Sequence, residues 1–80
     1  MAFDDIHPKA PVHKLIVPRQ HIATLNDLPA ASPLGGHMLQ VAKKIAQDCG
    51  IAVPGYRVMI NCNAGGGQIV YHLHLHLLGG

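Results

Sequence analysis

The last ten residues, from Tyr71 to Gly80, constrain the fold most, because histidine and leucine alternate along them. A period of two residues is that of a β-strand, in which successive side chains point to opposite faces. One face of this strand would carry three imidazoles, those of His72, His74 and His76. The other face would carry three core leucines, Leu73, Leu75 and Leu77. A strand without a chemical role would carry Thr, Ser or Lys on its polar face, so the row of histidines indicates a functional site.

The length and composition allow one small domain. Eighty residues are near the size at which a hydrophobic core is only just sufficient for stability. Hydrophobic residues make up 49% of the chain and charged residues only 12%, so we expect a partner to cover part of the apolar surface. A second copy of the chain is a common partner of this kind.

Charge, cysteine and hydropathy patterns exclude several classes of protein. A net charge of +2, with six Lys and Arg that form no run, is too weak for a general nucleic-acid binder. Cys49 and Cys62 form neither a CxxC pair nor a disulfide framework, which favours a reducing, cytoplasmic compartment. The first residues lack a cationic segment followed by an apolar one, and no apolar run reaches about eighteen residues. We therefore expect neither a signal peptide nor a membrane span.

Hydrophobic periodicity predicts one helix and several strands. The helix is expected over Leu34–Cys49, where apolar side chains recur at three- and four-residue spacings and Gly50 follows as a C-cap residue. A strand is expected to end at Ala2–Phe3, and further strands are expected over Val12–Val17, Tyr56–Asn61 and Ile69–Leu78.

The order strand–strand–helix–strand–strand predicts an α+β fold, in which an antiparallel β-sheet carries one long helix. A single helical turn is expected near Leu28 in the long loop, capped by Asn26 or Asp27. The first residues read as the end of a strand, and Gly79-Gly80 reads as the start of a turn. We therefore expect residues 1–80 to form a single, partial domain that lacks segments at both ends.

The spacing of the histidine row limits how a metal ion could be bound. Alternate residues of a strand lie about 6.7 Å apart, so His72 and His76 would be separated by roughly 13 Å. Two neighbouring histidines could chelate one ion, whereas all three would approach it nearly in a line, which zinc disfavours. Asp4, Asp5 and His13 could add ligands, so a zinc-binding protein stays a less favoured alternative.

A row of this length suits a phosphate group with its leaving group better than an ion. One imidazole could attack phosphorus, a second could hold the non-bridging oxygens or protonate the leaving group, and a third could orient the first. The run Gly65–Gly67 lies just upstream, and its backbone N–H groups could approach an anion closely. Asn61 and Gln68 flank this run and could bind sugar or phosphate oxygens.

These residues resemble a known family. The segment from Gly66 to Gly80 resembles the histidine triad signature, His-φ-His-φ-His-φ-φ with Gly-Gly-Gln upstream. The segment from Ala10 to Pro18 resembles the Ala-Pro-x-His strand of the same family, and Phe3 to Ile6 resembles the strand end before it. The chain is therefore identified as a member of the histidine triad (HIT) family. Within it, the resemblance is to the Hint branch of nucleotide-binding purine nucleoside phosphoramidases.

The resemblance implies roles for four histidines. His74 would be the nucleophile that takes up the nucleotidyl group as a covalent nucleotidyl-imidazole. His76 would contact the α-phosphate and help the leaving group to depart. His72 would hold the orientation and tautomer of the nucleophile, and His13 would complete the cluster from another strand.

The resemblance also implies a nucleotide site, a reaction and an assembly. Asp5 and Ile6 would line the ribose and base site, whereas Asn61, Gly67 and Gln68 would contact ribose or phosphate. The implied reaction is the hydrolysis of purine nucleoside phosphoramidates or aminoacyl adenylates to AMP, without a metal or another cofactor. The implied assembly is a homodimer whose interface uses the long helix.

One departure from the family pattern bears on activity. Many members carry a small or polar residue at the position of Ile69, so a hydroxyl contact to the leaving group is expected to be missing. A nucleotide-binding or protein-interaction module with little turnover is therefore the main alternative to a hydrolase. The remaining histidines, His7, His21 and His37, fall in loops or at a helix start and receive no role.

Overall fold

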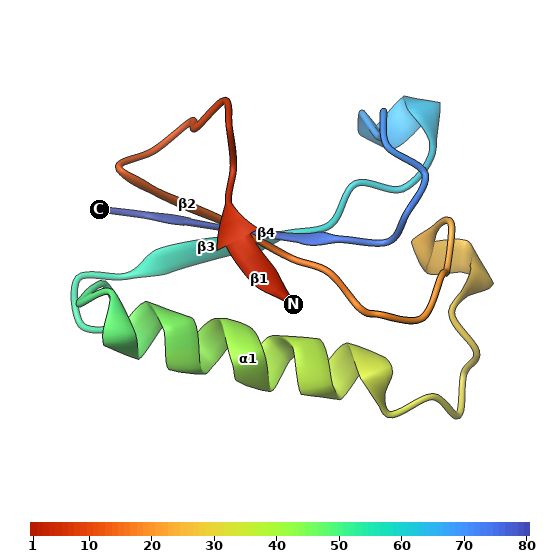
Figure 1. The fold of residues 1–80 in the computed structure, drawn as a ribbon, viewed down its shortest axis with the longest axis horizontal. Coiled ribbons are helices and arrows are strands. Elements are labelled where there is room, and N and C mark those ends of the chain that lie inside the picture. Colours follow the sequence, from red (N-terminus) through yellow and green to blue (C-terminus); the bar gives the residue numbers. More distant parts are fainter.

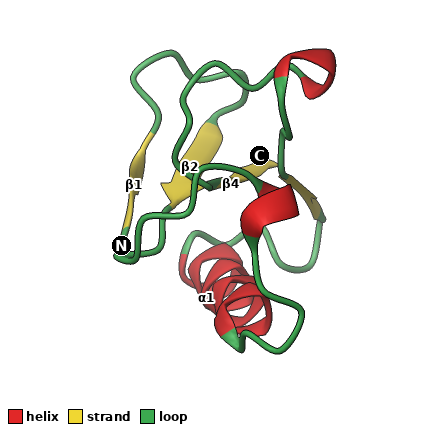
Figure 2. Cartoon of the chain, turned by 90° about the vertical axis from the view of Figure 1, so that its right-hand side faces the viewer, coloured by secondary structure: helices red, strands yellow, loops and turns green.

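One helix packs against one face of a four-stranded sheet in the computed structural model, which describes residues 1–80 (Figures 1 and 2). The helix is α1 (Leu34–Asp48). The strands lie side by side in the order β1 (Ala2–Asp4), β2 (Val12–Ile16), β4 (Leu75–Gly79) and β3 (Tyr56–Met59). Each neighbouring pair is antiparallel, so the predicted α+β fold with one long helix on an antiparallel sheet is confirmed.

The core lies between α1 and the sheet, because each presents an apolar face to the other. Ile16 of β2 and Leu75 of β4 belong to the same buried cluster as Met38 and Ala42 of the helix. A second cluster joins Leu77 to the last turn of α1 and to the segment after it. The three leucines expected in the core are at most 1% exposed: Leu73, Leu75 and Leu77. The predicted division of the last strand into a leucine face and a histidine face is therefore confirmed.

Strand β4 is shorter at its start than predicted, since Ile69–His74 is irregular rather than a strand. The reason is that its partners end first. The last backbone pairs at this end join Leu75 to Ile16 and His76 to Met59, and Pro18, which lacks an N–H donor, follows β2 closely. The alternation of buried and partly exposed side chains nevertheless continues back to His72.

The other elements end close to their predicted bounds. Helix α1 ends at Asp48 with Cys49 as its C-cap, and Gly50 follows with a φ of 74°, as the predicted C-cap glycine requires. Strands β2 and β3 end at Ile16 and Met59, slightly earlier than expected.

The expected helical turn in the long loop is η1 (Leu25–Asp27), but its capping residue is Thr24 rather than Asn26 or Asp27. The backbone N–H and the hydroxyl of Thr24 donate to Oδ2 of Asp27 at 3.2 and 2.9 Å. Asp27 therefore acts as the third-position acceptor of a capping box, a pairing that depends on two residues three positions apart. A second short turn, η2 (Ala64–Gly66), lies in the glycine-rich connection before β4.

Two further predictions about the whole chain can be compared with the structure. No helix combines the length and the apolar character that are needed to cross a bilayer. Cys49 and Cys62 are free cysteines.

Candidate active site

The predicted catalytic histidines lie on the face of the sheet that α1 leaves uncovered. Residues directly opposite each other on antiparallel strands point to the same face. His76 lies opposite Leu15, and His13 lies opposite Leu78, whereas the helix covers the face of Ile16 and Leu75. Strands β2 and β4 therefore bring His13 and His76 together, although they are 63 positions apart in the sequence.

The backbone fixes the protonation pattern of His74. Its Nδ1 lies 2.7 Å from the carbonyl oxygen of His72. A carbonyl oxygen can only accept, so Nδ1 of His74 carries the proton and donates it. In the neutral ring Nε2 then has the free lone pair, as a nucleophile requires. The contact that holds this tautomer comes from the main chain of His72, and the role expected of its side chain stays a prediction.

His76 lies beside His74 and is held by His13. The ring centroids of His74 and His76 are 5.0 Å apart, with an interplanar angle of 66°. On its other side, Nδ1 of His76 lies 2.9 Å from Nε2 of His13. The backbone N–H of Lys9 donates to Nδ1 of His13 at 3.0 Å, so the proton of a neutral His13 sits on Nε2. His13 therefore donates to His76, which leaves the proton of a neutral His76 on its own Nε2.

The Asp5 carboxylate lies next to this pair of hydrogen-bonded histidines. Its Oδ2 lies 3.4 Å from Nε2 of His13, and its Oδ1 accepts the backbone N–H of His7 at 2.8 Å. The hydrogen bond from His7 is the main cause that holds the pKa of Asp5 below its usual value, with smaller contributions from His13 and His76. The carboxylate is therefore ionised and lies beside the His13 ring, whose Nε2 proton is donated to His76.

Burial shapes the electrostatics of His76. Removal from water is the main cause that lowers the pKa of His76, and the nearby His74 and His13 lower it further, against a smaller opposite effect of Asp5. His76 is consequently neutral over a wider pH range than a free histidine. Its neutral form presents an N–H donor rather than a full positive charge.

The structure brings three of the residues named for the zinc alternative close together. Asp5, His13 and His76 each offer one ligand atom, and these atoms lie within 4.8 Å of one another. A metal ion binds Nε2 of His13 only if that nitrogen has a lone pair, and the proton of the ring is then on Nδ1. A proton on Nδ1 requires a hydrogen-bond acceptor beside it. Lys9 instead points a backbone donor at Nδ1. This pattern favours a shared proton between the histidines over a metal ion.

An apolar pocket of about 200 Å³ adjoins the histidines. His72 and His74 form one side of it. Its other lining residues are apolar: Phe3, Leu15, Val17 and Val70. None of these four was predicted as a site residue. The sequence did contain a signal for two of them, because Leu15 and Val17 alternate with Ile16 and so share a face of the strand with His13. Phe3 could be placed beside them only from the register between β1 and β2.

The glycine-rich connection is held by its own hydrogen bonds. The N–H groups of Gly66 and Gly67 donate to Asn63 and Ala64 rather than standing free for an anion. Gln68 is 4% exposed, and its side chain bridges three backbone groups. Its Oε1 accepts from the N–H of Asn63, and its Nε2 donates to the carbonyl oxygens of Ala23 and Val70.

The predicted nucleotide contacts of these residues stay predictions. Asn61 donates from Nδ2 to the carbonyl oxygen of Gly66, which leaves its Oδ1 without a partner in the loop. Gly67 and Gln68 use their N–H groups inside the loop, so a ligand contact from either would need another atom or a change in the loop. Ile6 is 87% exposed.

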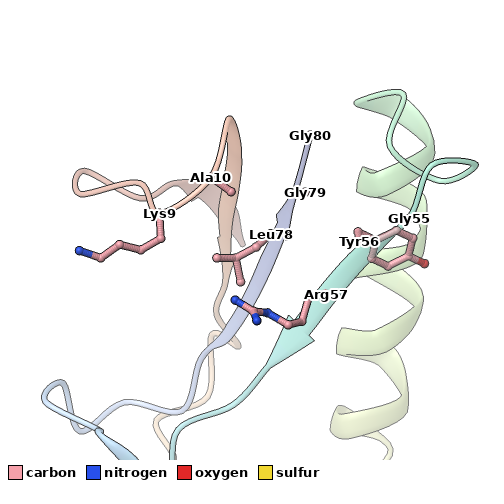
Figure 3. A pocket seen from close by; sticks show the side chains of 8 residues that line it. All are labelled: Lys9, Ala10, Gly55, Tyr56, Arg57, Leu78, Gly79 and Gly80. Carbon is pink, nitrogen blue, oxygen red and sulfur yellow. The ribbon is translucent and has the colours of Figure 1, made fainter.

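The largest hollow of the surface lies elsewhere. It measures about 380 Å³ at the far end of β4 (Figure 3). Lys9 and Arg57 come from the segments on either side of β4, and Leu78 and Gly79 of β4 also line the hollow. No imidazole lines this hollow, so it offers none of the chemistry of the histidine cluster.

The fold and the histidine cluster together define a histidine triad protein. The sequence model of the HIT domain matches residues 1–80, and the chain belongs to this family. The predicted family is thereby confirmed over the whole chain.

Relatives of known class agree with this assignment. The chain is 54% identical to the purine nucleoside phosphoramidase of Escherichia coli (strain K12) over 80 residues, which are 99% of this chain and 67% of that protein. A HIT family hydrolase from Legionella pneumophila is 56% identical and superposes with a TM-score of 0.96, over 99% of this chain and 71% of that one. A histidine triad nucleotide-binding protein from Candida albicans is 34% identical with a TM-score of 0.84, over 95% and 56% of the two chains. The prediction of a HIT-family enzyme is confirmed by these matches.

Proposed function

We propose that the chain hydrolyses purine nucleoside phosphoramidates or aminoacyl adenylates to AMP, through a covalent bond between phosphorus and Nε2 of His74. The observation that carries the proposal is the hydrogen bond from Nδ1 of His74 to the His72 carbonyl oxygen, because it leaves the Nε2 lone pair free. The family assignment and the phosphoramidase among its relatives support the same reaction.

The histidine cluster suits both halves of such a reaction. In the first, Nε2 of His74 bonds to the α-phosphorus, and the bond from phosphorus to the leaving group breaks. A departing amine takes up one proton, which a His76 that has been protonated by solvent can give from Nε2–H, returning to its neutral form. In the second, water attacks phosphorus, the bond to His74 breaks, and AMP leaves.

The apolar pocket provides a place for the base. Phe3 and Leu15 line it together with His74, and a purine is a flat, largely apolar ring that fits between such apolar side chains. Asp5 lies on the segment that follows β1 and carries an ionised carboxylate, which can accept hydrogen bonds from ribose hydroxyls. These contacts would orient the α-phosphate toward the histidines.

The homodimer belongs to the same proposal. Helix α1 exposes 54% of Leu39, so its outer side keeps apolar surface available for a second copy. Sedimentation of the wild-type chain beside a Leu39→Lys variant tests this part, since a monomeric wild type would contradict it.

A phosphoramidase assay tests the function. We expect release of AMP from an adenosine phosphoramidate, with the same rate in EDTA, and loss of release in His74→Ala with AMP binding retained. Tight AMP binding without turnover in the wild type would favour the binding-module alternative. Loss of activity in EDTA, with stoichiometric metal in the purified protein, would favour the zinc alternative.

A further inference from the structure

His21, which the sequence left without a role, contacts His72. The two Nδ1 atoms lie 3.4 Å apart, and the rings meet nearly edge to face, with centroids 5.1 Å apart and an interplanar angle of 80°. On the opposite side of the His72 ring, Nε2 lies 3.0 Å from the carbonyl oxygen of Pro18. Both nitrogens of His72 are therefore engaged by the loop that follows β2.

Only one arrangement of protons satisfies both contacts with neutral rings. The Pro18 carbonyl oxygen can only accept, so Nε2 of His72 carries the proton. Nδ1 of His72 then has a lone pair, and His21 must donate to it from its own Nδ1–H. His21 thus selects the His72 tautomer that Pro18 requires.

The loop that carries His21 is anchored without the help of its ring. The Ile22 carbonyl oxygen accepts the N–H of Leu73, and the Ala23 carbonyl oxygen accepts Nε2 of Gln68. Ile22 is also buried, at 6% exposure, whereas His21 is exposed. The loop after β2 and the segment that enters β4 lie side by side at one end of the sheet (Figure 1). The His21 ring can therefore be replaced without opening a cavity in the core.

We propose that His21 is a positioning residue for His74, acting through His72. A His72 ring held at both nitrogens keeps the main chain of His72 in place, and the carbonyl oxygen of that main chain accepts the Nδ1–H of His74. Without the His21 donor, only the Pro18 carbonyl oxygen favours this tautomer, so the His72 ring is held less firmly. The acceptor for His74 then becomes less fixed. The kinetic consequence rests on the proposed function, whereas the tautomer of His72 does not.

Nitrogen NMR of the full chain with labelled histidine tests the structural part directly. In the wild type we expect His72 protonated at Nε2 and His74 protonated at Nδ1. His21→Ala should raise the share of the Nδ1-protonated tautomer of His72 and leave His13 and His76 unchanged. His21→Asn should restore the single tautomer, because its amide N–H occupies the place of Nδ1–H. An unchanged His72 spectrum in His21→Ala, or identical spectra for the Ala and Asn variants, would overturn the proposal.

Kinetics on the same variants test the consequence for the reaction. We expect kcat for an adenosine phosphoramidate to fall about three- to tenfold in His21→Ala, the effect of one neutral hydrogen bond, with KM unchanged. The Asn variant should recover most of the loss, and His37→Ala, which removes another exposed histidine, should match the wild type. A lost tautomer with unchanged kcat would overturn the positioning role, and a wild type without turnover would count against the proposed function alone.

Discussion

The Nδ1 atom of His74 donates to the backbone carbonyl oxygen of His72, two residues earlier, over 2.7 Å. The tautomer of the candidate nucleophile is therefore set by the main chain of the histidine row itself. A side chain can be lost by a single substitution, whereas this acceptor is present whatever residue occupies position 72. The side chain of His72 contributes indirectly, by its contacts to Pro18 and His21.

The hydrogen bond from His74 to the His72 carbonyl oxygen predicts which of two substitutions in the histidine row lowers kcat more. His74→Ala removes the attacking atom and should lower kcat for an adenosine phosphoramidate by about a thousandfold or more. His72→Ala keeps the carbonyl acceptor but removes the ring that holds this part of the main chain in place. We therefore expect kcat to fall by about ten- to a hundredfold. Single-turnover rates measure both, and circular dichroism checks that both variants are folded. Equal losses in the two variants would show that the His72 side chain has a direct part in the reaction.

A proton given by His76 to the leaving group predicts a dependence on the kind of leaving group. An amine needs a proton as it departs, whereas the carboxylate released from an aminoacyl adenylate needs none. His76→Asn keeps an acceptor for His13 near the position of Nδ1 but removes the Nε2–H. We expect it to slow phosphoramidate hydrolysis about a hundredfold, within the range of general acid catalysis, and acyl adenylate hydrolysis about tenfold or less. The ratio of kcat/KM for the two substrates measures the effect, and an unchanged ratio would assign the proton to another donor.

The pKa of His76 also predicts how stability depends on pH. Burial, together with His74 and His13, lowers this pKa below the usual 6.5. Just below pH 6.5, His76 is therefore protonated in the unfolded chain but still neutral in the folded chain. The free energy of unfolding should therefore be highest above pH 6.5 and fall as the pH decreases through the window below it. Urea unfolding between about pH 5 and 8 measures this curve, and His76→Asn should flatten it. Parallel curves for the two proteins would show that other groups cause the slope.

The sequence was sufficient for much of the fold, because the decisive patterns are local. The period of two in the last strand separates the buried Leu73, Leu75 and Leu77 from the histidines without reference to the rest of the chain. The helix and its terminating Gly50 follow in the same way from spacing and backbone conformation. The start of β4 could not be found by this means, because it depends on where the partner strands end.

The hydrogen bonds of the site were outside the reach of sequence patterns for the same reason. Lys9 fixes the tautomer of His13 through its backbone N–H, and the residue type at position 9 does not reveal this hydrogen bond. His21 looks like a solvated loop histidine until the loop is placed beside His72. The amide of Gln68 holds the loop, because residues 23, 63 and 70 converge on it only in the folded chain, whereas its expected ligand contact stays a prediction.

Gln68 should consequently contribute to stability. Its amide is buried and satisfies the N–H of Asn63 and the carbonyl oxygens of Ala23 and Val70. Gln68→Ala leaves these groups without partners and should lower the free energy of unfolding by about 1–3 kcal/mol. Gln20→Ala, at an exposed position, is the matched control and should change it by less than about 0.5 kcal/mol. Urea denaturation measures both, and a Gln68 variant as stable as the control would mean that the loop is held by other contacts.

Two glycines of the chain should respond to alanine in opposite directions. A Cβ at Gly79 would lie 2.8 Å from Cδ1 of Ile51 and 3.3 Å from Cβ of Tyr56, so Gly79→Ala should destabilise the fold by about 1–3 kcal/mol through overpacking. A Cβ at Gly36, inside α1, would meet nothing within 4 Å, so Gly36→Ala should stabilise the fold by about 0.5–1 kcal/mol.

The double variant Gly79→Ala with Ile51→Val separates overpacking from other causes. Valine lacks the Cδ1 atom that a Cβ at position 79 would approach, so the second change should recover part of the loss, although Ile51→Val alone removes a buried methyl group and costs about 0.5–1.5 kcal/mol. Thermal and urea unfolding of the four proteins give the coupling free energy. A coupling of zero would show that the end of β4 shifts freely, and that the close approach of Ile51 is not what requires glycine there.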